Sequence, residues 1–492
     1  MVRVSQDTFP IVHLGRMDTK RKSYLLLLLG FIGALFFLVV KMALYDKLEY
    51  ELDLFSILQL SRDYVLDKPF LYENSYGDNK AVHNYYLMPL FAPLTLIFGG
   101  KGLFVGGFLL MLWALYLAVA LLKELPWGKA VLFLMLFFSP TAFFLWDNFR
   151  FGWHAETFFY PLSIIFISAL MLNRKFPAWA SATFIILNRE DGILIVLALY
   201  IMYEAAKSQE KIWAFFKRMV PAMVLGGIIF MGGIVLLHLF SGEESRINAT
   251  MKRFLENYTH ERLMIYFWDS AKNWFFLCGL VWILALYFMK KQTFLFWSMV
   301  CLAPIIAVNA YAGAYYFADP RYGINWAPRL AGTYGFLMSI LLVSMYYGKN
   351  DGKTKSPFIL PCVGLIVFLL QMLTLRNVPY QNFEYRLNLA FFLPAQKEDE
   401  RVIDELKKLS SRIPTSYPVR LDWNIFALFD HTDFMWNNAE SKPFREPRLL
   451  IVSGNNANSK PIPAGFEKIS QIGKFGVWAN PNDEETKSFV QN

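Results

Sequence analysis

Long apolar runs separated by short charged segments dominate residues 24–375 of this chain. The first run covers residues 24–44, and ten more follow, each twelve to twenty-two residues long. These ten lie at about 102–122, 128–146, 155–172, 177–188, 191–206, 219–240, 273–289, 293–310, 330–347 and 357–375. A helix needs about 20 apolar residues to cross a bilayer. The pattern therefore predicts a mainly α protein, a polytopic transmembrane bundle of about eleven spans.

Residues 45–101 interrupt this pattern and form a large first loop. The loop contains one apolar run, 85–98, which includes Pro89 and Pro93. Fourteen residues with two prolines make a poor spanning helix, because proline lacks the amide donor that a helix interior uses. We expect this run to re-enter the membrane or to lie in its outer interface.

The distribution of Lys and Arg predicts the orientation of the bundle. Segments on one side hold 18 Lys/Arg in 56 residues, and segments on the other side hold 14 in 120. The dense set consists of 1–23, 123–129, 173–176, 207–218, 290–291 and 348–355. Because cytoplasmic loops carry the excess of positive charge, this set is predicted to be cytoplasmic. Counting 85–98 as a span would exchange the predicted sides of all later loops and reverse the difference in Lys/Arg density between the two sides.

Two further predictions follow from that orientation. The short spans 177–188 and 191–206 form a hairpin whose charged tip faces outward. Residues 376–492 have a soluble composition and lie outside, where they form a small α/β domain with a helix at 396–412 and a strand at 449–452. The predicted location is the cytoplasmic (inner) membrane of the cell, with the N-terminal segment 1–23 inside as part of an uncleaved signal anchor.

Composition narrows the class of protein further. Hydrophobic residues make up 56% of the chain, more than soluble domains hold. The net charge of +9 resides in short loops rather than in a compact basic domain, so nucleic acid is not an expected partner. Cys278, Cys301 and Cys362 fall inside apolar runs without metal-ligand spacing, and they predict neither a metal centre nor a disulfide.

Four polar clusters fall on the predicted outer face. The first contains Glu49, Glu51 and Asp53, with His83 downstream, and the second is the segment 147–156 between two spans. The third is the hairpin tip 189–191, and the fourth is the segment 319–326. Their candidate site residues, beyond the first cluster, are Arg150, His154, Glu156, Arg189, Glu190, Asp191, Arg321 and Tyr322.

Each cluster by itself also has an ordinary explanation. The acidic stretch could end a span in solvent, His154 and Glu156 could form an interfacial pair, and Tyr322 could belong to an aromatic belt. Consecutive charges at the tip of two short spans instead indicate a water-filled cavity. Arginine binds phosphate in a bidentate way, and a carboxylate deprotonates a hydroxyl. Together the clusters favour a site for a phosphorylated lipid donor.

Several short motifs resemble those of a family of uncharacterised predicted membrane proteins. They are Glu51-Leu52-Asp53-Leu54-Phe55, Pro69-Phe70, His83 before a proline-containing apolar run, Phe151-Gly152-Trp153-His154-Ala155-Glu156 and Asn188-Arg189-Glu190-Asp191-Gly192. That family looks like part of the membrane-embedded C-type (GT-C fold) glycosyltransferase superfamily. The resemblance covers about residues 45–345, with one departure: Arg189 stands where a lysine would be expected.

The resemblance implies an inverting transfer of a sugar from a polyprenyl-phosphate-linked donor to a glycan, lipid or protein acceptor. Asp53 maps onto the catalytic carboxylate of the first outer loop. His154, Glu156, Glu190 and Asp191 map onto motifs that orient the substrates or hold a metal ion. Arg189 and Arg321 are the expected phosphate ligands. The pattern allows a divalent metal ion but contains no motif that requires one.

Two other functions fit the same pattern. A transporter or flippase for a lipid-linked glycan would also place charges at a mid-chain hairpin, although the spans show no two-fold repeat. An inactive relative would serve as a scaffold for glycan assembly, with 376–492 binding the partners. Measurements of sugar transfer and of lipid translocation distinguish these three hypotheses.

Overall fold

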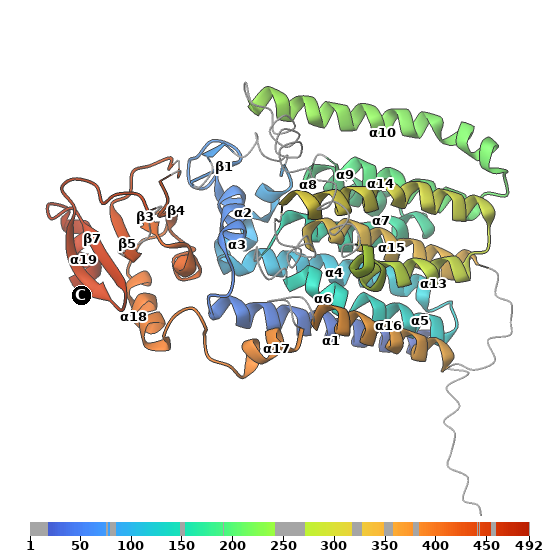
Figure 1. Cartoon of the computed structure of the whole chain (residues 1–492), viewed down its shortest axis with the longest axis horizontal. Coiled ribbons are helices and arrows are strands. Elements are labelled where there is room, and N and C mark those ends of the chain that lie inside the picture. The colour runs from blue at the N-terminus through green and yellow to red at the C-terminus, as the bar shows by residue number, and fades with distance from the viewer. Residues whose placement is uncertain are drawn as a thin grey trace, which may run out of the picture.

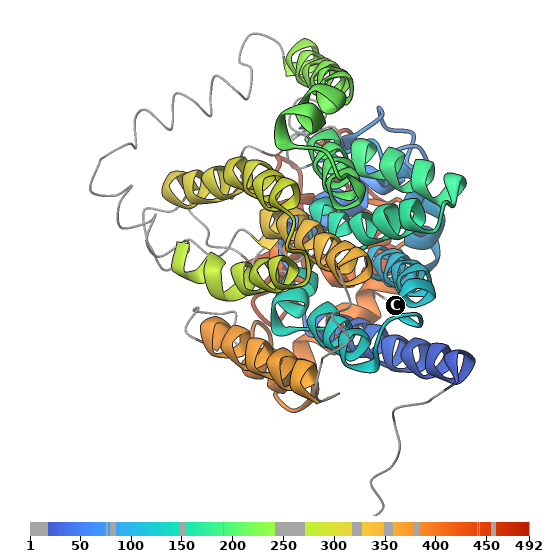
Figure 2. The ribbon, with the colours of Figure 1, turned by 90° about the vertical axis from the view of Figure 1, so that its right-hand side faces the viewer.

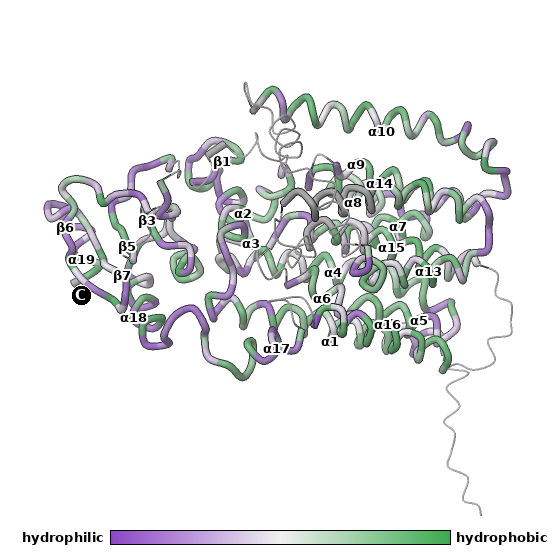
Figure 3. Tube along the Cα trace, viewed as in Figure 1, coloured by the Kyte–Doolittle hydropathy of each residue, from purple (hydrophilic) through white to green (hydrophobic). Residues whose placement is uncertain are grey.

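The structure is a computed structural model of the 492-residue chain. The residues it describes are 18–74, 77–78, 85–147, 153–189, 191–241, 271–316, 327–348, 358–376, 383–439, 441, 443–453 and 459–491. Figure 1 shows a long bundle of helices with a smaller α/β region at one end. Figure 3 shows that the bundle helices are mostly hydrophobic, whereas hydrophilic residues are frequent in the α/β region.

Every apolar run that was expected to span a membrane is helical. The helices are α1 (Thr19–Asp46), α4 (Lys101–Leu122), α5 (Trp127–Phe137), α6 (Pro140–Asp147), α7 (Phe159–Met171), α8 (Lys175–Asn188), α9 (Gly192–Lys207), α10 (Ile212–Ser241), α13 (Leu280–Phe288), α14 (Gln292–Tyr316), α15 (Ala327–Tyr347) and α16 (Ile359–Arg376). A short 3₁₀ turn, η4 (Ala155–Phe158), precedes α7, and a π turn, η5 (Phe275–Gly279), precedes α13. Among the described residues, seven helical segments are long and apolar enough to cross a membrane.

Two of the helices are shorter than a full span, and one candidate span is interrupted. The helices α8 and α9 have 14 and 16 residues, as their predicted role in a hairpin requires. The helices α5 and α6 form one candidate span, Trp127–Asp147, that is interrupted before Pro140. Pro140 starts α6 because the first turn of a helix does not use the amide that proline lacks.

The helices α7 and α15 form the centre of the bundle, and α10 and α16 lie at its edge (Figure 2). Almost every residue of α7 is buried. Close approach of the two central helices requires a glycine: a Cβ on Gly335 would lie 2.9 Å from the carbonyl oxygen of Phe159. Small residues allow such backbone contact between helices in a membrane. The candidate spans at the edge expose apolar side chains along most of their length.

Loops of the bundle separate into the two sets that the charge distribution predicted. At one end, the amine of Lys22 donates to the carbonyl of Lys123 at 3.1 Å, and that of Lys291 donates to Ala206 at 2.6 Å. At the other end, Lys101 forms an ion pair with Asp46 at 2.6 Å. Loops that share a predicted side of the membrane therefore share an end of the bundle.

The first loop lies across the end of the bundle that carries the α/β region. It contains α2 (Leu52–Arg62), the short antiparallel pair β1 (Tyr72–Glu73) and β2 (Gly77–Asp78), a 3₁₀ turn η3 (Met88–Phe91) and α3 (Ala92–Phe98). The turn and α3 together make an apolar helix of only eleven residues, too short to span. Its Leu90 and Ile97 are exposed, as expected for a segment in the membrane interface.

The C-terminal part is an α/β unit, as expected for 376–492. Its helices are α17 (Phe383–Phe391), α18 (Glu400–Ser410), the 3₁₀ helix η7 (Trp423–Leu428) and α19 (Glu484–Gln491). Five strands form one mixed sheet in the order β4 (Asp433–Trp436), β3 (Pro418–Leu421), β5 (Leu449–Ser453), β7 (Phe475–Ala479) and β6 (Glu467–Ile472). The predicted helix at 396–412 and strand at 449–452 are confirmed.

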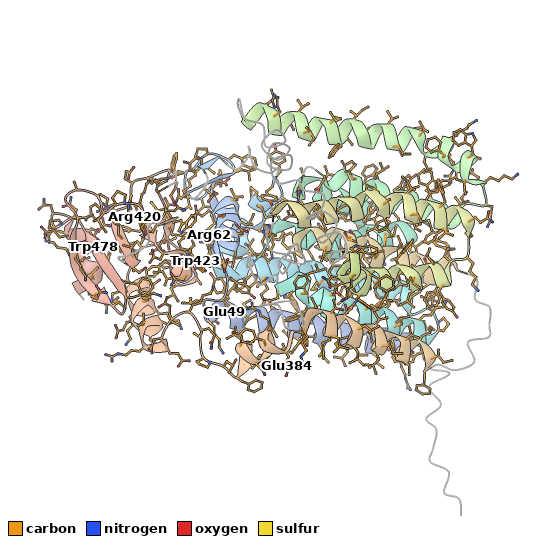
Figure 4. All side chains as sticks on the ribbon, viewed as in Figure 1. Glu49, Arg62, Glu384, Arg420, Trp423 and Trp478 are labelled. Carbon is orange, nitrogen blue, oxygen red and sulfur yellow. The ribbon has the colours of Figure 1, made fainter. Side chains whose placement is uncertain are left out.

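This unit packs directly against α2. The ring of Phe55 contacts Phe426 and Phe434 at centroid distances of 5.5 and 6.0 Å. The amide of Gln59 donates to the carbonyl of Phe434 at 2.8 Å. The guanidinium of Arg62 donates to the carbonyl of Asp430, and Figure 4 shows Arg62 between α2 and the α/β unit. The helix α2 is thus enclosed between the bundle and the C-terminal unit.

Candidate active site

The helix α2 positions Asp53 at the end of the bundle. Glu51 is the N-cap residue with extended backbone, and Asp53 lies in the first turn. A carboxylate there is favoured by the partial positive charge of the helix N-terminus. Of the three carboxylates in this stretch, Asp53 is the one that faces the second cluster. Its carboxylate oxygen Oδ2 lies 3.2 Å from Nε2 of His154.

The imidazole of His154 lies between two carboxylates. His154 is the N-cap of η4, and its backbone is extended. Nε2 faces Asp53, and Nδ1 lies 3.4 Å from Oε2 of Glu156. Glu156 follows two residues later in η4, so the local turn brings its carboxylate back toward the ring. Both ring nitrogens of this one histidine are therefore engaged by acidic side chains.

The hairpin of α8 and α9 delivers Arg189 to the same place. Its tip is fixed by the amide of Asn188, which donates to the carbonyl of Ala155 at 2.8 Å, and by the amide of Leu87, which donates to the carbonyl of Leu187 at 2.9 Å. The turn is so tight that a Cβ on Gly192 would lie 2.0 Å from the carbonyl oxygen of Ile185. Only glycine fits there.

Arg189 extends the line of alternating charges. Its Nη1 lies 2.6 Å from Oε1 of Glu156, and its Nε lies 3.3 Å from Oδ1 of Asp191. Acidic and basic side chains thus alternate from Asp53 through His154, Glu156 and Arg189 to Asp191. We call these five residues the open cluster, because Asp53 is 29% exposed and Asp191 is 40% exposed.

The two carboxylates determine the protonation state of His154. Burial lowers the pKa of the imidazole, but the side chains of Asp53 and Glu156 outweigh that effect and raise the pKa to about 9. His154 is therefore a cation at neutral pH. A positively charged ring cannot accept a proton, so in this arrangement His154 orients the carboxylates rather than acting as a base.

An apolar cavity of about 420 Å³ begins at the open cluster and extends into the bundle. Glu156, Arg189 and Asp191 line its polar end. The rest is lined mainly by aliphatic and aromatic side chains of α7, α9, α10, α14 and α15, among them Leu194, Ile201, Met223, Pro304 and Phe336. The volume falls within the ~300–1,000 Å³ typical of small-molecule sites. The arrangement suits an amphipathic ligand with an anionic head and an apolar chain.

The structure brings together five of the predicted site residues, namely the open cluster. Glu51 remains at the N-cap of α2, where its charge acts on Lys397 of the C-terminal part. The other predicted site residues lie outside the described residues: His83, Arg150, Glu190, Arg321 and Tyr322. In the described part of the chain, no group of three or more His, Cys, Asp or Glu residues is arranged to hold a metal ion.

Sequence reasoning missed a second ionic group, next to the first. Asp147 accepts from Nε of Arg386 at 2.6 Å, from Nη2 of Arg386 at 2.9 Å and from the hydroxyl of Tyr50 at 2.8 Å. Glu49 lies 3.7 Å from Nη1 of Arg386. Figure 4 shows Glu49 where α1 meets the C-terminal part. We call Glu49, Tyr50, Asp147 and Arg386 the closed cluster, because these side chains are almost completely buried.

No local signal in the sequence joins the closed cluster. Arg386 is 239 residues from Asp147, in a segment that reads as part of a soluble tail.

Comparisons of the chain with protein-family models, with curated proteins and with solved structures found no match.

Proposed function

We propose that this protein is a membrane-embedded inverting glycosyltransferase that uses a polyprenyl-phosphate-linked sugar. The observation that carries the proposal is the apolar cavity within the bundle, which ends at Arg189. Arginine binds phosphate through its planar fork of donors, and an aliphatic cavity accommodates an isoprenoid chain. In this proposal the phosphate of the donor binds at Arg189, and its isoprenoid chain lies in the apolar part of the same cavity.

The acceptor approaches from the side of Asp53. Asp53 takes the proton of the acceptor hydroxyl as the oxygen attacks the anomeric carbon. The bond from that carbon to the phosphate oxygen breaks, and the polyprenyl phosphate leaves with the electron pair. Because the attack is a single in-line displacement, the anomeric configuration inverts. Arg189, and in our proposal also Arg321, stabilises the charge that develops on the phosphate.

The charged His154 keeps Asp53 and Glu156 in place during this step. A general base must lie within hydrogen-bond reach of its proton in a defined direction, and an ion pair restricts the rotamers of the carboxylate. The site faces the outer side of the membrane in this proposal, in agreement with the density of Lys and Arg in the loops at the opposite end of the bundle.

The test is sugar transfer by purified protein in proteoliposomes, supplied with a panel of radiolabelled polyprenyl-phosphate sugars. Arg189→Gln should lower donor binding about tenfold or more, because a charge-assisted contact to phosphate is lost. Arg218→Gln is the matched control: Arg218 also bridges two carboxylates, Glu204 at 2.7 Å and Glu210 at 3.0 Å, but on the surface and outside the cavity.

Absence of transfer from every donor, with translocation of a lipid-linked sugar across the same vesicles, would identify a transporter instead. Absence of both donor binding and transfer would leave the scaffold hypothesis.

A further inference from the structure

The closed cluster joins the two chain segments that carry Asp53 and His154. Tyr50 lies three residues before Asp53, and Asp147 lies seven residues before His154. The hydroxyl of Tyr50 donates to Oδ1 of Asp147 at 2.8 Å. One hydrogen bond therefore connects the residue two positions before α2 to the last residue of α6, on the two segments that also carry Asp53 and His154.

Arg386 secures this connection from the C-terminal part. Its Nε and Nη2 form a bidentate pair with the carboxylate of Asp147, and the side chains of Arg386 and Asp147 are 1% and 5% exposed. A bidentate pair fixes direction as well as distance. Arg386 also lies 5.9 Å from the centre of the Tyr50 ring. The carboxylate of Asp147 is thus held in one orientation, toward Tyr50.

The helix α1 adds Lys41 to the surroundings of the cluster. The amine of Lys41 donates to the backbone carbonyl of Asp147 at 3.1 Å and to that of Trp146. It also lies over the ring of Tyr50, 5.0 Å from its centre. Lys41 satisfies carbonyls that the last turn of α6 leaves without helical partners. The end of α6 and the ring of Tyr50 are therefore both fixed relative to α1.

We propose that Tyr50, Asp147 and Arg386 are positioning residues that hold Asp53 against His154. The expected effect on catalysis rests on the proposed function. The contact between Asp53 and His154 is present without substrate, so it can be measured independently. The cluster makes no contact with the cavity and acts through the two segments it ties together. A shift of about 1 Å at reacting groups lowers rates by up to about a hundredfold.

Tyr50→Phe is the sharpest test, because it removes only the hydroxyl that links the two segments. We expect kcat to fall about ten- to a hundredfold, with the KM of the donor nearly unchanged. We also expect the pKa of His154, followed by NMR of ring-labelled histidine in detergent, to fall from about 9 toward the ordinary value near 6.5 as Asp53 moves away. Among the described residues, Asp53 and Glu156 face this ring, and Arg189 is linked to it through Glu156.

Tyr160→Phe is the matched control. The hydroxyl of Tyr160 is equally buried and donates to the carbonyl of Phe137 at 2.8 Å, inside the bundle. A merely structural loss of a buried hydrogen bond would affect both variants alike. We expect the pKa of His154 and kcat to change in Tyr50→Phe and to remain unchanged in Tyr160→Phe.

The double variant Asp147→Asn with Arg386→Met is a second test that does not depend on the first. Removing both charges avoids leaving the carboxylate of Asp147 buried without Arg386, and Glu49, which also loses Arg386, keeps the charge of Lys397 nearby. We expect the same fall in the pKa of His154. An unchanged pKa and an unchanged kcat in Tyr50→Phe or in the folded double variant would overturn the inference. The titration needs no substrate, so a fall in pKa in a protein without transferase activity would refute the proposed function and leave the positioning role intact.

Discussion

The open and the closed cluster are built from the same kinds of side chain but differ in what surrounds them. Both contain carboxylates bridged by an arginine, and both take residues from the first loop and from the chain at and after the end of α6. In the closed cluster, the pair of Arg386 and Asp147 is 1% and 5% exposed, and protein atoms surround it. In the open cluster, the pair of Arg189 and Asp191 is 11% and 40% exposed and lines a cavity. Similar ionic chemistry therefore suits a structural role in one place and ligand binding in the other.

The contrast shows why composition of a cluster does not determine its role. Ionic groups that are completely buried cost desolvation free energy, and they are retained where they hold segments in register. Groups that border a cavity keep part of their hydration and are accessible to a ligand. The following predictions test the contrast, from the largest expected effect to the smallest.

Asp53→Asn should reduce sugar transfer by about 10²–10⁴-fold, the usual contribution of a general base. The amide keeps the shape of the carboxylate but cannot accept the proton. Because the change also removes one of the two carboxylate partners of the charged His154, transfer is compared at a temperature at which the variant is fully folded. Transfer is measured in proteoliposomes and unfolding by intrinsic fluorescence. Glu51→Gln is the matched control at the N-cap of the same helix. Full activity of Asp53→Asn would show that Asp53 is not the general base.

Arg386→Met should lower the free energy of unfolding by about 3–5 kcal/mol, because Asp147 would remain buried without its partner. Arg218→Met removes an exposed arginine with two carboxylate partners and should cost only about 0–1 kcal/mol. Unfolding of the two variants in detergent is compared with that of the wild type. Equal stabilities would show that the closed cluster contributes no more than a surface pair.

Stability should also depend on pH through His154. The pKa of His154 is raised to about 9 in the folded chain, from about 6.5 when unfolded, so the charged ring stabilises the fold below pH 6.5. This contribution, on the order of 3 kcal/mol, is lost as pH rises from about 6.5 to 9. His154→Asn should remove the dependence of the free energy of unfolding on pH between about 6.5 and 9 that His154 causes.

Leu194→Trp should narrow the cavity near the open cluster. We expect about a tenfold rise in the KM of a long-chain donor and a smaller rise for a short-chain analogue, because the bulky ring competes with the apolar chain for space. Leu225→Trp is the matched control, since Leu225 is 59% exposed on α10 and does not line the cavity. Equal KM values for the two variants would show that the cavity does not bind the donor.

The sequence alone predicted the elements of the fold well. Apolar runs became helices at all eleven expected places, since burial in a bilayer is a local property of consecutive residues. Three contacts between described residues join chain segments that the density of Lys and Arg placed on the same predicted side, while the orientation in a membrane stays a prediction. The run 85–98 holds an apolar helix of only eleven residues, and its exclusion as a span stays a prediction. The motifs also selected five residues that the fold brings together.

The motif resemblance singled out Asp53 in the first cluster, but only the tertiary structure showed which partner each of the three carboxylates meets. Glu49 faces Arg386, Glu51 caps α2 near Lys397, and Asp53 faces His154. They are two residues apart in sequence, and each meets a partner from a different part of the chain. The pattern of neighbouring residues carries no information about such partners.

The closed cluster and the cavity were likewise decided by packing. Arg386 reaches Asp147 from a segment that hydropathy assigns to a soluble tail, and five helices spread between Phe159 and Tyr347 line the cavity. Local sequence determines which segments leave water, because each residue contributes its own transfer free energy. Which side chains then meet depends on contacts between segments hundreds of residues apart, and these exist only once the whole chain has packed.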